Sequence, residues 1–362
     1  MSTSQTETAL KKLVIQPDMF DVQRYRALVP SVDKNDVRYL DASYQPPMNL
    51  KIRQAIDSFL DAAVYEANPK PNWQASIEGT RALVARYLEA PTPASIAFTS
   101  DTTEGLNLFQ RSLKFGAGDN VVILDTEHPN HAYGWLALRA TRLEVRQVNT
   151  HGKLFADAST FAPMVDENTK AIGISSIVFH SGQKNNVKDI CDRYRPLGVQ
   201  VLVEMTQEVD VGPVSVKDTG VSAACFSFHK ALGCPTGLGA LYVDPTILDE
   251  LKLDPPIVGA GSIANLAPTL LASSGLTEYH HSTRRFEHLN LSFISIKAAH
   301  AALEFLLNDM TPEGVERHLR SLGSKLQEEC DKLGIEIIGE REPSKHSPHC
   351  YVLNLICLEA AL

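Results

Sequence analysis

A lysine between a predicted strand and a glycine-rich turn is the residue in this sequence best placed to do chemistry. Lys230 ends the run Ser-Phe-His-Lys, which overlaps the end of the apolar segment 223–228, and a second apolar segment begins at Gly239. Burial lowers the pKa of a lysine, and the neutral amine can form a Schiff base with an aldehyde. Ser227 and His229 flank Lys230 and can donate hydrogen bonds to an anion. Most lysines are exposed, so the alternative for Lys230 alone is an ordinary loop residue.

A carboxylate and an amide follow the preceding predicted strand. The segment 199–205 is apolar apart from Gln200 and Glu204, and Gln207 follows three residues after Glu204. A carboxylate at a buried strand end needs a partner, and a protonated pyridine nitrogen is one. A turn cap or an ion pair with a basic side chain is the alternative.

Two further groups stand after predicted strands upstream. Thr102 and Thr103 join the strand at 95–100 to a helix, and hydroxyls with unpaired N–H groups at a helix N-terminus form an anion site. An ordinary helix cap, with Glu104 in the first turn, is the alternative. His128 follows the strand at 120–126, where an imidazole could stack on a planar ring, although a lone histidine is more often structural.

The elements that must position these groups alternate between strand and helix. Short apolar segments at 95–100, 120–126 and 170–178 are separated by helical ones, and the alternation continues to about residue 244. This predicts an α/β fold with a mostly parallel sheet flanked by helices. Ligands of such sheets bind at the carboxyl ends of the strands. We therefore expect the named side chains to meet at one edge of the sheet.

The rest of the chain predicts three parts. Residues 1–30 form an N-terminal arm, residues 31–255 a large domain, and residues 256–362 a smaller α+β C-terminal domain that looks incomplete because the chain stops directly after a strand. The remaining predicted elements are a short strand running into a turn at 37–43, helices at 48–67, 79–90, 292–307 and 312–334, and strands at 335–340 and 350–358.

Taken together, these motifs resemble those of class V, fold-type-I pyridoxal-phosphate (PLP) enzymes, the superfamily of cysteine desulfurases and class V aminotransferases. The resemblance spans about residues 39–307. Its most specific element is S-x-H-K followed by G-x-G-x-L-Y-V, and the T-T-E-G and E-H elements are moderately specific. It implies PLP as the cofactor and Lys230 as the lysine that carries it, with Lys230 and His128 as catalytic residues. The residues implied to bind PLP are Thr102, Thr103, His128, Glu204, Gln207, Ser227, His229, Lys230 and Asn290.

The sequence also departs from the family pattern. Glu204 stands where the family has aspartate, and its longer side chain must shift the ring or retract the strand. Asn290, in "RFEHLN", stands where the family has the threonine of R-F-E-x-G-T, which reaches the phosphate of the neighbouring subunit. The resemblance thus implies a homodimer with shared active sites. Ser43 and Ala42 would face the substrate pocket. The family's asparagine after the strand at 170–178 has three candidate counterparts here, which are His180, Ser181 and Gln183.

The implied function is that of a PLP-dependent enzyme acting on an amino acid or related amine through an external aldimine and a Cα carbanion, aminotransferase-like or lyase-like. The alternatives are a carbon–carbon bond-forming or cyclising enzyme of secondary metabolism, a cysteine desulfurase, and a catalytically inactive homologue. A desulfurase needs a nucleophilic thiolate, but Cys350 opens an apolar strand pattern and is expected to be structural. Arg284 and Arg285 could bind a substrate carboxylate or be exposed arginines.

The composition of the chain argues against some classes of partner. The chain has 362 residues, with 34 Lys and Arg against 43 Asp and Glu and a net charge of −9, which argues against nucleic acid as a partner. No stretch approaches the roughly 18 apolar residues of a membrane span, and the first 12 residues lack an apolar signal region, so a cytoplasmic protein is expected. The six cysteines lack metal-site spacing, so we expect free thiols and no metal.

Overall fold

The computed structural model describes residues 21–33, 38–269, 271, 275 and 277–355. A seven-stranded sheet runs through the molecule in the order β1-β7-β6-β5-β4-β2-β3. Only β7 is antiparallel to its neighbours, which confirms the predicted, mostly parallel sheet. The strands are β1 Ile96–Thr99, β2 Asn120–Leu124, β3 Glu144–Val148, β4 Thr169–Ser175, β5 Gln200–Glu204, β6 Ala223–Ser227 and β7 Gly239–Val243.

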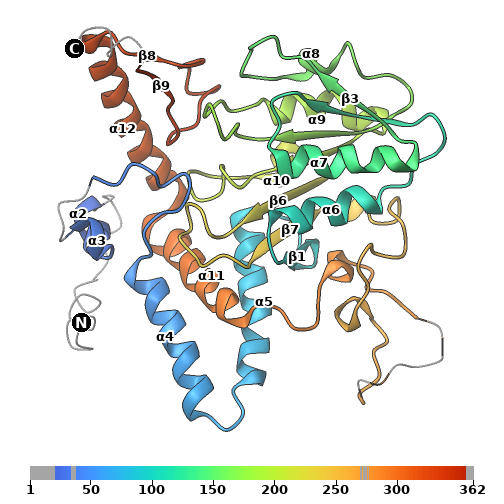
Figure 1. The fold of residues 1–362 in the computed structure, drawn as a ribbon. Helices are drawn as coiled ribbons and strands as arrows, with labels where there is room; N and C mark the ends of the chain where they lie inside the picture. The colour runs from blue at the N-terminus through green and yellow to red at the C-terminus, as the bar shows by residue number, and fades with distance from the viewer. Residues whose placement is uncertain (1–20, 34–37, 270, 272–274, 276, 356–362) are drawn as a thin grey trace.

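Both faces of the sheet are covered, as continuous apolar strands require. Side chains alternate along β2, so that Val121 and Ile123 join one apolar core and Val122 and Leu124 join another. The first core is covered by α6 (Thr102–Ser112) and α7 (Pro129–Ala137), which lie across the sheet in Figure 1. The second core is covered in part by α9 (Val187–Tyr194).

Three long helices pack together beside the sheet. The helices α4 (Leu50–Tyr65) and α5 (Lys70–Tyr87) both contact α11 (Phe293–Phe305), and the three lie side by side in Figure 1. Small side chains, among them Ala298 and Ala302, allow α11 to approach closely. Residues from before and after the sheet thus share one core with it.

The C-terminal part holds the long helix α12 (Pro312–Leu333) and a short hairpin of β8 (Glu336–Ile337) and β9 (Leu353–Asn354). Gly334 ends α12 with φ at +68°, a conformation that glycine adopts at little cost. The other described helices are α2 Val22–Arg26, α3 Pro30–Asp33, α8 Ala158–Phe161 and α10 Val216–Thr219, with 3₁₀ turns at Pro93–Ser95, Leu138–Thr141, Arg195–Leu197, Pro245–Ile247, Ala260–Ser262 and Thr283–Phe286 and a π turn at Leu306–Met310.

Two sequence expectations need correction. Residues 38–41 form no strand, and only the turn at 42–44 appears, because Tyr39 and Leu40 are 40% and 93% exposed and no strand in the described part of the chain pairs with them. The strand expected at 350–358 is limited to Leu353–Asn354, while residues 356–358 lie outside the described residues.

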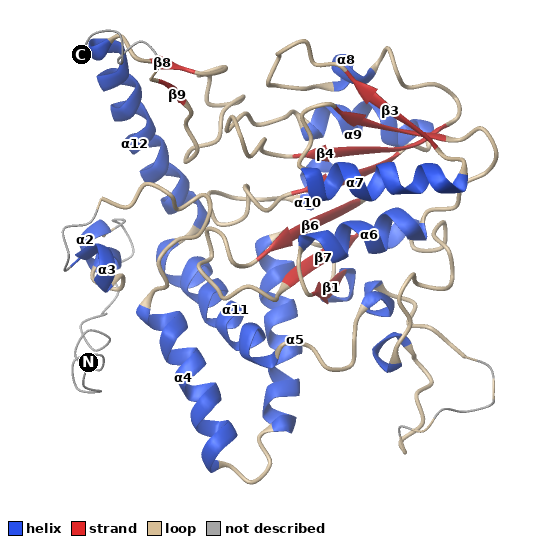
Figure 2. Ribbon diagram, viewed as in Figure 1, coloured by secondary structure: helices blue, strands red, loops and turns tan. Residues whose placement is uncertain are grey.

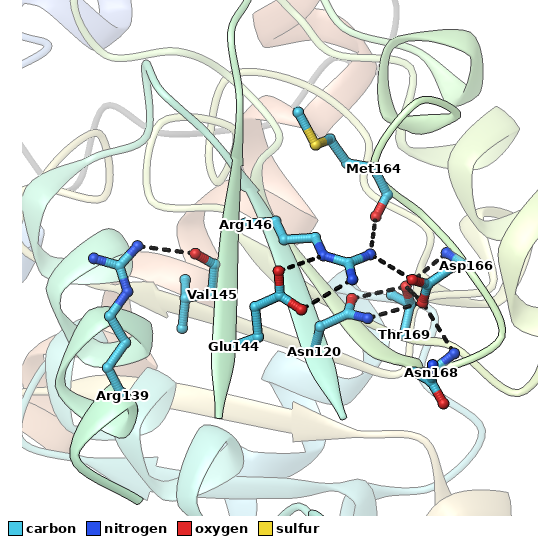
Figure 3. A network of polar contacts seen from close by, with 9 residues as sticks. All are labelled: Asn120, Arg139, Glu144, Val145, Arg146, Met164, Asp166, Asn168 and Thr169. Atoms are coloured by element: carbon cyan, nitrogen blue, oxygen red, sulfur yellow. Dashed lines mark hydrogen bonds and ion pairs between the residues drawn. The ribbon is translucent and has the colours of Figure 1, made fainter. Parts of the chain in front are cut away.

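A polar network fastens the amino ends of the strands, away from the carboxyl edge where a site was expected (Figure 3). Arg146 donates to Glu144 and to Asp166, and Asn120 also donates to Asp166. Thr169 at the start of β4 donates to Asn120 at the start of β2. The hydrogen bonds and charge of Arg146 lower the pKa of Asp166 to about 2. The network therefore ties the starts of β2, β3 and β4 together, at the point where the pairing of β2 with β4 shifts by one residue.

No helix within the described ranges is long and apolar enough to span a bilayer.

Candidate active site

The residues singled out from the sequence meet at the carboxyl edge of the sheet. A cavity of about 560 Å³ lies there, within the size range of small-molecule sites. Residues that follow β1, β2, β5 and β6 line the cavity, because these four strands all end at this edge of the sheet. Eight of the nine expected PLP-binding residues line it, and they are Thr102, Thr103, His128, Glu204, Gln207, Ser227, His229 and Lys230.

One end of the cavity presents hydroxyl and backbone donors. Thr102 begins α6, and both its N–H and its hydroxyl lie close to the Ser227 hydroxyl, at 2.9 and 2.6 Å. The Thr102 hydroxyl also lies 2.8 Å from that of Thr206. Among the described residues, no protein group pairs with the N–H or hydroxyl of Thr103. With the positive end of α6 behind it, this end is suited to a phosphate.

Lys230 and Glu204 stand on adjacent strand ends in the same cavity. Burial lowers the pKa of Lys230, and the charge of Glu204 opposes that shift in part. Within the described chain, no hydrogen-bond or salt-bridge partner holds the Lys230 amine. The lysine is therefore available to react, with a pKa closer to neutrality than that of an exposed lysine.

Glu204 fits into the strand without disturbing it. The register of β5 against β4 and β6 is regular through Glu204. Its Oε1 accepts a hydrogen bond from the Thr206 N–H at 2.8 Å, which draws the carboxylate toward its own turn. Among the described residues nothing donates to Oε2, so one oxygen of this buried carboxylate is left for a ligand.

His128 stands at the N-terminus of α7 with an aromatic neighbour. Its Nδ1 accepts from the Asn130 N–H at 3.2 Å, which fixes the ring plane and leaves Nε2 as the protonated nitrogen of the neutral form. The ring of Phe179 meets it edge-on, with centroids 4.8 Å apart. Burial and the Lys230 charge lower the pKa of His128, while Glu204 raises it. A neutral imidazole in this position can stack on a planar ring.

Phe179, rather than His180, Ser181 or Gln183, is the cavity residue of the loop that follows β4. His180 is exposed, Ser181 is buried beside Gln183, and Gln183 bonds to the backbone of Glu340. None of the three lines the cavity, because the tight turn at Gly182 directs the chain away toward the C-terminal segment. An aromatic residue in a loop carries no polar signature, so no sequence signal pointed to Phe179.

Four other expected residues lie away from this cavity. Asn290 accepts from Lys70 at 3.1 Å on the exposed side of α5. Arg285 is buried and donates to the Leu248 carbonyl, whereas Arg284 pairs with Glu78 on the surface. Neither arginine reaches the cavity, since η6 (Thr283–Phe286) turns both toward other elements. Ala42 is exposed, and only its neighbour Ser43 lines the cavity.

The C-terminal segment reaches the site, which was not expected from the sequence. His349 approaches Gln207, its Nε2 lying 3.2 Å from Gln207 Oε1. Cys350 precedes β9 instead of opening a strand, and its thiol points to the Phe179 carbonyl at 3.9 Å. Burial raises the pKa of Cys350, although the Lys230 charge opposes this. The thiol is therefore half-buried and mainly protonated near neutral pH.

The donor set fits PLP. Unpaired donors gather at the N-terminus of α6 for a phosphate, the open Oε2 of Glu204 suits a protonated ring nitrogen, and the Lys230 amine suits an aldehyde. Within the described chain, no group of three or more His, Cys, Asp or Glu side chains is placed to hold a metal ion.

Comparisons with known proteins agree with this geometry. A model of the aminotransferase class-V family matches residues 54–359. An uncharacterized aminotransferase of Schizosaccharomyces pombe is 52% identical over 92% of this chain and 84% of its own length. A cysteine desulfurase of Yersinia pestis is 28% identical over 79% of this chain and 72% of its own.

Solved structures show the same fold. The cysteine desulfurase of Thermococcus onnurineus NA1 superposes with a TM-score of 0.79 at 22% identity, covering 94% of this chain and 84% of that one. Escherichia coli cysteine desulfurase CsdA gives a TM-score of 0.80 at 19% identity, covering 95% and 84%. These likenesses confirm the fold-type-I architecture. The chain belongs to the aminotransferase class-V family and is a PLP-dependent enzyme.

Proposed function

We propose that this enzyme acts on an amino acid or related amine, with Lys230 moving the proton at the substrate Cα, in an aminotransferase-type or lyase-type reaction. The observation that carries the proposal is that Lys230, whose pKa is lowered by burial, lines the same cavity as Glu204, whose Oε2 has no donor in the described chain. PLP, when bound, supplies an electrophilic aldehyde and an electron-withdrawing ring.

Each of these cavity residues would have its own role toward the cofactor or the substrate. Thr102, Thr103 and Ser227 would hold the phosphate, with the α6 N-terminus behind them. Glu204 Oε2 would accept a hydrogen bond from the ring nitrogen and keep it protonated, because a buried carboxylate favours a nearby cation. His128 would lie on one face of the ring. Lys230 Nζ would first hold the aldehyde and then, once displaced by the substrate amine, take and return the Cα proton.

His229 and Gln207 are the other two expected cofactor-binding residues that line the cavity. Burial and the Lys230 charge lower the pKa of His229, so a neutral imidazole lines the cavity as a hydrogen-bond donor near the phosphate end. Gln207 would lie beside the ring. No arginine is among the described residues that line the cavity, so the group that would hold a substrate carboxylate is not part of this proposal.

A homodimer with shared active sites is part of the proposal. Asn290 lies away from the cavity of its own chain, on the surface beside Lys70. This placement supports a role toward a second copy, whose phosphate Asn290 would reach. Equilibrium sedimentation of the PLP-loaded protein tests the dimer, and a monomer at micromolar concentration would contradict it.

We also propose that the enzyme works in the cytoplasm on a small molecule, with no nucleic acid or membrane as partner. The five cysteines of the described residues are all unpaired and four are buried, as is usual in a reducing compartment.

Several relatives are named cysteine desulfurases, but the thiol chemistry of this chain does not favour that activity. A desulfurase needs a thiolate, whereas burial raises the pKa of Cys350 and leaves it protonated. Bond-forming chemistry and an inactive homologue remain alternatives without a structural observation in their favour.

Borohydride reduction tests the proposal directly. The purified protein loaded with PLP should be yellow, and reduction should fix the cofactor on the peptide that contains Lys230. The Lys230→Ala variant is the control and should lose the label. A screen of amino acids and simple amines for a change in absorbance, and for release of keto acid or eliminated group, then identifies the reaction. Wild-type protein that stays colourless and unlabelled would overturn the proposal.

A further inference from the structure

One cavity residue is held by both a segment before the sheet and a segment after it. Gln207 follows β5, and its Nε2 donates to the Ser43 carbonyl at 3.1 Å. Its Oε1 lies 3.2 Å from Nε2 of His349, 142 residues further along the chain. Ser43 and Gln207 both line the cavity. The three segments therefore meet at the side chain of Gln207.

The hydrogen bonds determine how each group is oriented. A backbone carbonyl can only accept, so the amide nitrogen of Gln207 must face Ser43 and its oxygen must face His349. His349 must then donate from Nε2. Burial, together with the charges of His346 and Lys230, lowers the pKa of His349 to about 4, so near neutral pH it is the neutral tautomer protonated on Nε2.

The surroundings of His349 favour the tautomer that carries its proton on Nε2. Its Nδ1 is buried with no hydrogen-bond partner among the described residues, so a proton there would go unpaired. Gln207 Oε1 has no other donor in the described chain. Loss of the His349 donor would leave a part-buried amide oxygen unpaired and would allow the amide to flip.

We propose that His349 is a positioning residue for the PLP site, which acts by holding the Gln207 amide in one orientation along the cavity wall. The proposal rests on the proposed function, because it assigns His349 a role toward the cofactor that the cavity would bind. It makes cofactor binding depend on the C-terminal segment, whose described residues do not themselves line the cavity. The proposed role rests on the contact between His349 Nε2 and Gln207 Oε1 in this chain.

A series of His349 variants separates positioning from packing. In His349→Gln the amide nitrogen can reach the former place of Nε2 and donate to Gln207. In His349→Asn the shorter amide stops near the former place of Nδ1, and His349→Leu has no donor. His318→Leu, on α12 and outside the cavity, is the matched control.

The measurements are the affinity for PLP, by fluorescence titration of the cofactor-free protein, and the absorption maximum of the bound cofactor. Because an acceptor is left unpaired beside the ligand, His349→Leu and His349→Asn should bind PLP about tenfold more weakly and shift the absorption maximum. His349→Gln should restore both, and His318→Leu should match the wild type. If His349→Leu fails to fold, the comparison of His349→Gln with His349→Asn still decides.

A double-variant cycle shows whether His349 acts through Gln207. In a Gln207→Leu background, His349→Asn should cause no further loss of PLP affinity. An additive loss would overturn the positioning role, as would His349→Asn binding PLP like the wild type. Wild-type protein that does not bind PLP would instead overturn the proposed function, and this role with it.

Discussion

The hydroxyl of Ser227 lies 2.6 Å from the hydroxyl of Thr102 and also accepts the Thr102 N–H at 2.9 Å. Ser227 ends strand β6 and Thr102 begins helix α6, so two elements that are 125 residues apart in sequence are joined at the cavity. The pair fixes the helix N-terminus, with its unpaired donors, against the strand that leads to Lys230. The pair would thereby hold the proposed phosphate site and the Lys230 amine at a constant separation.

Removing that junction should weaken cofactor binding. Ser227→Ala leaves the Thr102 N–H unpaired and lets the first turn of α6 shift, so we expect PLP affinity to fall about tenfold, the effect of one lost hydrogen bond at a charged ligand. Fluorescence titration of the cofactor-free protein measures this. Ser295→Ala, a buried serine of α11 outside the cavity, is the control and should bind PLP normally. Equal affinities for the two variants would contradict the phosphate-site assignment.

The carboxylate of Glu204 should matter through its charge. Glu204→Gln keeps the shape and removes the charge, so we expect kcat to fall by about 10²- to 10³-fold, as when one electrostatic contact is lost from an active site. Glu204→Asp keeps the charge and should retain most of the activity. Steady-state kinetics with the amine found by screening measures both. A Glu204→Gln enzyme as active as the wild type would show that the ring is not held by this carboxylate.

The same substitution should move the titration of Lys230. Burial lowers the pKa of the lysine and Glu204 raises it, so removing the Glu204 charge lowers it further. In cofactor-free protein, the reaction of the Lys230 amine with an acylating reagent, followed by peptide mass spectrometry, should reach half-maximum at a lower pH in Glu204→Gln than in the wild type. An unchanged midpoint would mean that the two groups do not interact.

A residue of this site could be predicted when the feature that places it lies next to it in the sequence, and could not be predicted when it is placed by a distant segment. The strand ends, Lys230 and Glu204 could be placed from sequence because a residue that follows a strand of a parallel sheet must lie at its carboxyl edge. His349 could not, because its contact with Gln207 joins segments 142 residues apart through side chains alone. The strand expected near Tyr39 failed for a related reason, since strand formation depends on a partner that local sequence does not specify.

His349 also makes stability depend on pH. Its pKa is about 4 in the folded protein against an ordinary 6.5, so the unfolded chain takes up a proton first as the pH falls. The folded state is therefore favoured in full above about pH 6.5 and loses stability between pH 6.5 and 4. Urea unfolding should show a smaller loss over this range for His349→Gln than for the wild type. Identical pH profiles would contradict a neutral, buried imidazole.

A buried ion pair ties the segment that carries Asn290 to the sheet. Glu287 accepts from both terminal nitrogens of Arg81 and from the Phe98 N–H, and Arg81 also donates to the Ile96 carbonyl. Glu287→Leu removes the buried ion-pair partner of Arg81 and leaves the Phe98 N–H unpaired, while Glu78 remains paired with the guanidinium. The substitution should therefore cost about 3 kcal/mol in the free energy of unfolding, the lower end of the range for a broken buried ion pair. The double variant Arg81→Met/Glu287→Leu should recover part of that loss. Urea denaturation decides, and an additive double variant would show that the two side chains act independently.

Asp210 is destabilising in its charged form, and its removal should stabilise the protein. Burial raises the pKa of this carboxyl to about 7. Its Oδ1 is buried and has no hydrogen-bond partner in the described chain. The backbone φ of residue 210 is +68°, which asparagine tolerates, so Asp210→Asn should not strain the chain. Because the folded pKa exceeds the unfolded one, the wild type is most stable below about pH 4 with respect to this group and loses stability as the pH rises to 7. Asp210→Asn avoids that loss, so its advantage should grow across this range to about 1–3 kcal/mol at pH 8. Urea unfolding at several pH values measures the difference, and Asp61→Asn, an exposed residue of α4, controls for the change in net charge. A constant or absent advantage would show that Asp210 is solvated or paired when charged.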